Sequence, residues 1–138
     1  MNSKVMRSAL LIIGAMAAIC GLARAADRPA LYTAAQADDG SYIFTHRCAE
    51  CHGSQMEGLT APALKGFDFR QRRSARITNA QALLTFISLY MPRGKPASLT
   101  AEEYSDIAAF ILQQNGFPAG NTKLSADTPN LQDVELNQ

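Results

Sequence analysis

The chain has 138 residues, enough for one compact domain. Its 13 Lys and Arg side chains and 12 Asp and Glu side chains give a formal net charge of +1 at pH 7. An N-terminal segment carries three of these cations and no acid, so the remainder has a net charge of −2. This balance argues against nucleic acid as a partner, because binding to phosphates requires a basic face.

Residues 1–25 have the three parts of a secretory signal peptide. A basic start is followed by an apolar run, and the small residues Ala23 and Ala25 then offer a cleavage site. We predict cleavage near Ala25 and export to the periplasm. A membrane anchor is the alternative, but the apolar run is short for a stable span. A lipoprotein anchor at Cys20 is a further alternative, which Ile19 disfavours because a small residue is expected there.

An extended arm precedes a helix that is predicted to cover most of residues 33–52. Thr33 can cap this helix, and Gln36 stands three residues later, as in a capping box. Gly40 and Phe44 are four residues apart and share one face. Glycine inside a helix is destabilising by about 1 kcal/mol relative to alanine, so Gly40 predicts the close approach of another backbone.

Residues 53–76 hold three glycines and one proline, and we predict an irregular loop there. The helix that follows carries an apolar stripe formed by Leu83, Ile87 and Tyr90. Pro92 ends this helix, because proline disfavours helical geometry at the residue before it.

The strongest helical pattern begins at Thr100, which forms a capping box with Glu103. Ile107, Phe110 and Ile111 line one face of this helix. It ends in an Asn-Gly pair followed by a proline, which are typical residues of a helix end.

These patterns predict one all-α domain, residues 26–118, followed by a polar C-terminal tail, residues 119–138, that packs loosely or frays. No stretch shows the alternation of a convincing strand, and no internal repeat is present. Tyr90 and Tyr104 are expected to be core aromatics.

Two thiols and an imidazole stand close together at Cys48, Cys51 and His52, near the end of the first predicted helix. This spacing places all three groups on one helical face. A disulfide here would close a very small loop and stabilise little. A zinc site would lack a second C-x-x-C pair, and a redox dithiol requires a βαβ context. The C-x-x-C-H sequence is typical of c-type haem attachment, so we predict one covalently bound haem c.

A haem iron held by His52 takes a sixth ligand, and Met56 and Met91 are the two methionines outside the signal peptide. Met56 is four residues past His52, too short a path to reach the opposite face of the ring. Met91 is forty residues past Cys51, at a helix end from which a thioether can point inward. A methionine that only fills the core is the alternative. We predict Met91 as the second iron ligand.

With these residues in place, the chain resembles a class I cytochrome c over about residues 34–118. The similarity is carried by Gly40 and Phe44 before CAECH, and by GLTAPAL, YMPRGKPASLT and EEYSDIAAFIL. The last part of the pattern is similar to cytochrome c domains fused to, or alongside, quinoprotein alcohol and sugar dehydrogenases. The resemblance implies a small helical bundle around one covalent haem, with Gly40 and Phe44 crossing the last helix near Phe110.

The resemblance also implies roles for residues of the loop after the haem motif. The carbonyl of Pro62 would accept a hydrogen bond from Nδ1 of His52, which would orient the imidazole and strengthen it as a donor. Gly58 matches the loop glycine that precedes this proline in the family. Pro62 is therefore predicted to belong to the cofactor site.

His46 and a basic cluster are left outside this pattern. His46 would be an iron ligand, a proton-linked group or, as we favour, an exposed helix residue. The cluster would lie in a solvated loop, pair with haem propionates or dock an acidic partner; it comprises Arg70, Arg72, Arg73 and Arg76.

The predicted function is the transfer of single electrons, because Met/His ligation fills both axial positions and raises the potential. Electrons would enter from a periplasmic dehydrogenase and leave to an oxidase or another cytochrome of a respiratory chain. The protein would be a carrier and not an enzyme. The alternatives are an obligate cytochrome subunit of a quinoprotein dehydrogenase complex and a haem enzyme with a labile sixth ligand. A small exported scaffold protein remains if no haem is attached.

Overall fold

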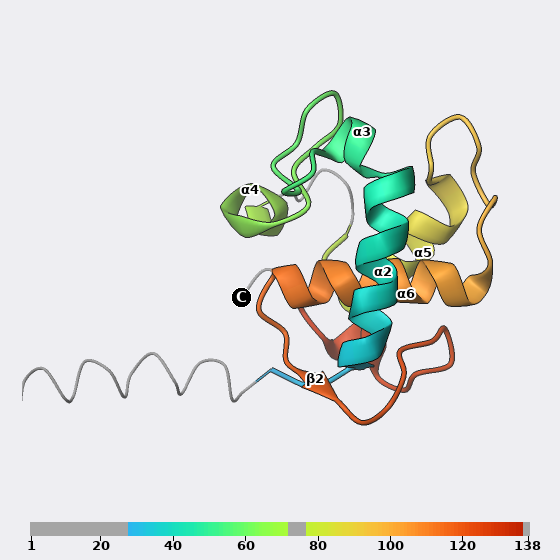
Figure 1. Ribbon diagram of the computed structural model, residues 1–138. Helices are drawn as coiled ribbons and strands as arrows, with labels where there is room; N and C mark the ends of the chain where they lie inside the picture. The colour runs from blue at the N-terminus through green and yellow to red at the C-terminus, as the bar shows by residue number, and fades with distance from the viewer. Residues whose placement is uncertain (1–27, 72–76, 137–138) are drawn as a thin grey trace, which may run out of the picture.

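The computed structural model describes residues 28–71 and 77–136, in which most of the regular structure is helical (Figure 1). The elements in chain order are β1 (Tyr32–Thr33), α2 (Ala34–Arg47), α3 (Ala49–His52), α4 (Gly66–Gln71), α5 (Ala80–Tyr90), α6 (Ala101–Gln114), β2 (Ala119–Gly120) and η2 (Leu131–Asp133). The two strands are two residues long each and pair in parallel. The predicted all-α class is confirmed.

The centre of the fold is the crossing of α2 and α6 (Figure 1). A Cβ atom on Gly40 would lie 1.9 Å from the backbone oxygen of Asp106, so a side chain there would force the helices apart. One turn further along α2, the ring of Phe44 meets the ring of Phe110 edge-on, with centroids 5.6 Å apart. The predicted close approach at Gly40 and the contact near Phe110 are both confirmed.

Side-chain caps fix the starts of α2 and α6. The Thr100 hydroxyl accepts from the Glu103 N–H at 3.1 Å, and the Glu103 carboxylate accepts from the Thr100 N–H at 2.7 Å, which confirms the predicted capping box. Thr33 accepts from the Gln36 N–H at 3.2 Å. The expected second half of this box is wrong, because the buried Gln36 side chain bonds the backbone N–H and carbonyl of Leu124 instead, each at 2.8 Å.

Helix α5 packs against α6 and begins at Ala80, directly after Asn79, whose side chain caps it. Leu83 and Ile87 of the predicted stripe are buried. Tyr90 is not a core aromatic as expected, because its side chain is 58% exposed. The last turn of α5 extends past the core, where the Tyr90 ring lies against Phe86 with centroids 5.1 Å apart.

The stretch predicted to be an irregular loop contains a short helix, α4. Phe69 of this helix is buried, and the Gly66 N–H at its start donates to Oδ1 of Asn115 at 3.1 Å. A helix of six residues is too short to show an apolar period in the sequence. Its start is fixed by a side chain from the end of α6, which the local sequence does not reveal.

The C-terminal segment packs against the core, so the predicted loose or frayed tail is wrong. Its backbone bonds the region around the start of α5, with Ala80 N–Val134 O and Leu136 N–Thr78 O distances of 2.9 Å. Four of its apolar side chains are buried: Leu124, Leu131, Val134 and Leu136. These four side chains are separated by polar residues and follow neither a helical nor a strand periodicity. The sequence therefore predicted a polar tail.

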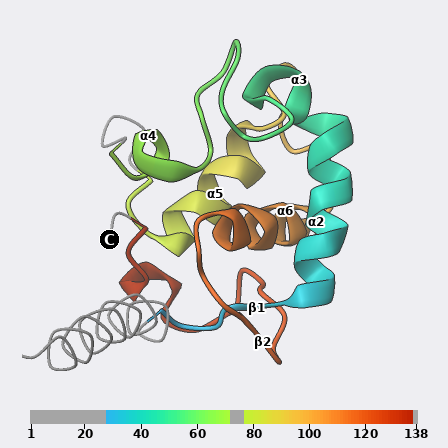
Figure 2. The ribbon, with the colours of Figure 1, turned by 60° about the vertical axis from the view of Figure 1, so that its left-hand side comes forward.

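The strand pair closes the fold at the end of α2 that lies away from α3 (Figure 2). Tyr32 pairs with Ala119 and Thr33 with Gly120, which joins the start of the described chain to the segment after α6. The predicted signal peptide, residues 1–25, lies outside the described residues and stays a prediction. Within the two described ranges, no helix combines the length and apolarity that crossing a membrane requires.

Candidate functional site

The C-x-x-C-H motif forms the junction between α2 and the one-turn helix α3. The Cys48 N–H donates to the Phe44 carbonyl at 2.9 Å, which continues the bonding pattern of α2. The His52 N–H donates to the Cys48 carbonyl at 2.9 Å, which closes the turn. Cys48, Cys51 and His52 therefore lie within one helical turn, and all three line the same cavity.

The His52 ring is oriented by the loop that follows it. Its Nδ1 lies 2.7 Å from the carbonyl oxygen of Pro62, the contact that the family resemblance implied. A carbonyl oxygen can only accept, so Nδ1 carries the proton and Nε2 holds the lone pair. Gly58 allows the loop to fold back with a φ of +83°, and a Cβ there would lie 2.6 Å from the Ala63 nitrogen. The site thus offers an imidazole whose Nε2 can bind a metal.

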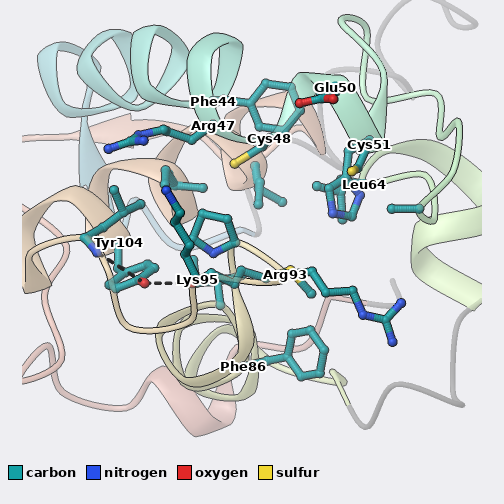
Figure 3. A pocket seen from close by; sticks show the side chains of 18 of the residues that line it. Phe44, Arg47, Cys48, Glu50, Cys51, Leu64, Phe86, Arg93, Lys95 and Tyr104 are labelled. Atoms are coloured by element: carbon teal, nitrogen blue, oxygen red, sulfur yellow. Dashed lines mark hydrogen bonds between the residues drawn. The ribbon is translucent and has the colours of Figure 1, made fainter.

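The cavity has a volume of about 710 Å³ and lies between the C-x-x-C-H motif and α5 (Figure 3). This volume falls within the range of about 300–1,000 Å³ that is common for ligand and cofactor sites. Much of the wall is apolar, and its main aliphatic and aromatic side chains are Phe44, Leu64, Leu83, Phe86, Ile107 and Ile111. Such a wall would exclude water from a large apolar group bound inside.

Met91 lines this cavity, and Met56 does not. The side chain of Met56 is buried in the core, only 1% exposed. Met91 caps the C-terminus of α5, and its neighbours Phe86 and Arg93 lie across the cavity from Cys48 (Figure 3). Of the two methionines considered as iron ligands, Met91 is therefore the one with access to the cavity.

The surroundings of the two cysteines differ, because Cys48 is half-buried and Cys51 is exposed. Burial raises the pKa of Cys48 to about 11; the neighbouring Cys51 adds to the rise, and Arg47 opposes it. Across the described parts of the chain, no three His, Cys, Asp or Glu side chains converge where they could hold a metal ion.

Basic side chains surround the mouth of the cavity. Arg47 comes from the end of α2, and Arg93 and Lys95 come from the loop after α5 (Figure 3). Glu50 is the acidic side chain of the lining. Outside residues 1–25 the chain has ten Lys and Arg against twelve Asp and Glu, so these three cations gather on a chain whose net charge is −2. The sequence did not single out these three cations, because they gather from separate segments.

The other candidates lie at the rim or away from the cavity. His46 is exposed, as we favoured. Its Nδ1 lies 2.8 Å from the carbonyl oxygen of Tyr42. The imidazole also lies beside the Tyr42 ring, with the two ring centroids 4.4 Å apart. It also lies at the rim of the cavity. Arg70, in α4, does not line the cavity. Three members of the predicted basic cluster lie outside the described residues: Arg72, Arg73 and Arg76.

Tyr104 is a site residue that the sequence did not reveal. Its side chain is 3% exposed, which confirms the expected core position. Its hydroxyl also donates to the backbone carbonyl of Met91 at 2.7 Å. The two residues are 13 positions apart on different segments, and no local pattern signals their contact.

A protein-family model described as cytochrome c oxidase, cbb3-type, subunit III matches residues 35–111. The chain belongs to this family. It is a c-type cytochrome, and haem c is the cofactor that the family implies. Electron transfer is the activity of this class of protein.

Among solved structures, the cytochrome is similar to the sulfane dehydrogenase SoxCD from Paracoccus pantotrophus. The sequence identity is 26% and the TM-score is 0.53, over 78% of this chain and 55% of that chain. The cytochrome thus spans about half of the length of the solved chain that it matches. No curated protein matches its sequence.

The residues of the cytochrome that face the cavity fit a haem. A large apolar space has two thiols and an imidazole at one wall and a thioether sulfur in its lining. Neutral imidazole and thioether are ligands that haem iron takes in electron-transfer proteins. The basic residues at the mouth are suited to carboxylates such as the haem propionates.

Proposed function

We propose that the cytochrome carries single electrons through one haem c held covalently in the cavity. The observation that supports this proposal most directly is that Cys48, Cys51, His52 and Met91 line one apolar cavity. The four residues come from two segments about forty positions apart. Their convergence gives an attachment site and two axial ligands in the same space.

Each of these residues has a distinct role in the proposal. Cys48 and Cys51 would form the thioether links, and Nε2 of His52 and the sulfur of Met91 would bind the iron. Pro62 keeps the proton on Nδ1 of His52 through the 2.7 Å contact, so Nε2 stays available as the donor. When bound, the haem supplies a one-electron iron couple.

The residues that line the cavity favour an electron carrier over a haem enzyme with an open iron site. Met91 lines the cavity from the end of α5, so a ligand is available for the second axial position. A haem iron bound by both His52 and Met91 would offer oxygen or peroxide no open coordination site. The apolar side chains of the lining would limit entry of water to the haem.

We propose export to the periplasm, with a dehydrogenase as the electron donor and an oxidase or another cytochrome as the acceptor. The SoxCD match supports a dehydrogenase partner, and the family description names an oxidase subunit. An obligate subunit of a dehydrogenase complex is the alternative, and the quinoprotein class of that enzyme stays a prediction. Co-purification of a large catalytic chain at constant ratio through size-exclusion chromatography would favour the subunit over the free carrier.

The intact mass of the purified, exported protein tests the proposal. We expect the mass of the chain after cleavage near Ala25 plus one haem, retained under denaturing conditions. Cys51→Ala should leave a single thioether, while Cys48→Ala with Cys51→Ala should release the haem on denaturation. A wild-type mass equal to that of the bare chain would refute covalent attachment.

A further inference from the structure

We infer that Tyr104 is the positioning residue for Met91: its hydroxyl holds the loop between α5 and α6 so that the methionine stays directed at the haem iron. This inference rests on the proposed function. The Tyr104 hydroxyl donates to the Met91 carbonyl at 2.7 Å and lies 3.4 Å from the Leu99 N–H, which can donate to it. One phenol oxygen thus connects both ends of the loop.

Met91 needs such a support because it lies where helical bonding ends. Its N–H still donates to the Ile87 carbonyl at 3.1 Å, but its own backbone is extended, with φ −119° and ψ 154°. The loop that follows, residues 92–98, is largely exposed. Its backbone bond from the Lys95 N–H to the Pro92 carbonyl is internal to the loop and does not attach it to the core.

Tyr104 is a rigid point of attachment for this loop. It lies in the first turn of α6, and its N–H donates to the Thr100 carbonyl at 3.1 Å. The same turn is fixed by the capping box of Thr100 and Glu103. The ring is buried and lines the cavity beside the α2–α6 crossing. A hydroxyl held in this way restricts Met91 more than a solvent-exposed bond would.

Loss of the Tyr104 hydroxyl should weaken the binding of the Met91 sulfur to the iron relative to that of an added ligand. The Met91 carbonyl would lose its partner, and the loop would gain conformational freedom whenever the sulfur dissociates. The net contribution of one buried hydrogen bond corresponds to about a two- to tenfold change in an equilibrium constant. Tyr104→Phe keeps the buried ring and removes only this oxygen.

The chain offers a matched control in Tyr32. This tyrosine is 1% exposed, and its hydroxyl donates to the Phe117 carbonyl at 2.6 Å. It lies in β1 and does not line the cavity. Tyr32→Phe therefore removes the same kind of buried bond at a place remote from Met91.

The experiment compares oxidised holoprotein of wild type, Tyr104→Phe and Tyr32→Phe in a titration with cyanide, which competes with a thioether sulfur for ferric haem iron, followed by visible spectroscopy. We expect the apparent affinity for cyanide to be about two- to tenfold higher in Tyr104→Phe than in wild type, and the same in Tyr32→Phe as in wild type. Thermal unfolding of all three variants reports the general loss of stability. Equal affinities in Tyr104→Phe and Tyr32→Phe, at any stability, would overturn the inference.

Met91→Ala in the same titration separates the inference from the proposed function. If Met91→Ala binds cyanide much more tightly than wild type, Met91 is the ligand, and the Tyr104→Phe result then decides the inference alone. If Met91→Ala and wild type respond alike, the proposed ligand set fails, and the role of Tyr104 fails with it.

Discussion

At the α2–α6 crossing, the residue at position 40 sets how closely the two helices approach. The Cβ of any other residue would collide with the Asp106 carbonyl, and the contact between Phe44 and Phe110 one turn away depends on the same spacing. Phe44 also lines the cavity. A change at Gly40 would therefore reach the site through the packing of α2.

We predict that Gly40→Ala destabilises the holoprotein by about 1–3 kcal/mol or more, because the helices must separate to admit a methyl group. The free energy of unfolding from a denaturant titration measures this. Ser41→Ala, the next position on α2, is the matched control and should change the value by less than about 0.5 kcal/mol. If Gly40→Ala is as stable as this control, α2 and α6 do not pack as closely at Gly40 as the structure indicates.

At the scale of elements, the segment after α6 is part of the core. The Gln36 side chain in α2 bonds both backbone groups of Leu124, and Leu131 in η2 is fully buried. The neighbouring Gln132 is exposed. These contacts attach the C-terminal segment to α2 and to the start of α5.

Leu131→Ala should lower the free energy of unfolding by about 2–5 kcal/mol, the usual effect of removing a large buried aliphatic side chain. Gln132→Ala, in the same short helix, should have almost no effect. Both values come from denaturant unfolding of the holoprotein. If the two variants are equally stable, the C-terminal segment does not pack as described.

Asp106, in α6, links the stability of the helix crossing to pH. Burial raises the pKa of its carboxyl, the side chain of Gln36 opposes the rise, and the nearby acids Glu102 and Asp39 add to it. A raised pKa means that the folded protein holds this proton to a higher pH than the unfolded chain. Ionisation of Asp106 therefore reduces stability as pH increases.

Asp106→Asn removes this ionisation and keeps the size of the side chain. The stability of wild type relative to Asp106→Asn should fall as the pH rises from about 4, the ordinary carboxyl range, toward neutrality. Denaturant titrations of both proteins across this range measure the difference. A relative stability that rises with pH would contradict the direction of the pKa shift.

At the scale of the whole molecule, the charge distribution favours an acidic partner at the cavity mouth. The chain after residue 25 has a net charge of −2, yet Arg47, Arg93 and Lys95 gather at the cavity. Such an asymmetry orients a charged partner during its approach and raises the association rate at low ionic strength.

Small redox reagents test this without knowledge of the partner. Arg93→Glu with Lys95→Glu should slow oxidation of the reduced protein by ferricyanide, an anion, about threefold or more at low salt, and should accelerate oxidation by a cationic cobalt complex. Lys65→Glu, which does not alter the cavity lining, is the control. Equal rates for the control and the double variant would exclude steering by the mouth.

The sequence predicted the features that depend on neighbours in the chain. Thr100 and Glu103 form their capping box within four residues, and the spacing of Cys48, Cys51 and His52 is local. The features it missed join distant segments: Gln36 to Leu124, Tyr104 to Met91, and Asn115 to the start of α4. No periodicity or motif within a single segment of the sequence indicates any of these three hydrogen bonds.

The central claim, that Met91 and His52 fill both axial positions of a covalent haem, is tested most directly by the visible spectrum of the reduced holoprotein before and after carbon monoxide. We predict sharp c-type bands that carbon monoxide leaves unchanged in wild type and shifts in Met91→Ala. Wild-type bands that shift at once on addition of the gas would show an open or labile position and would contradict the account of this protein as an electron carrier.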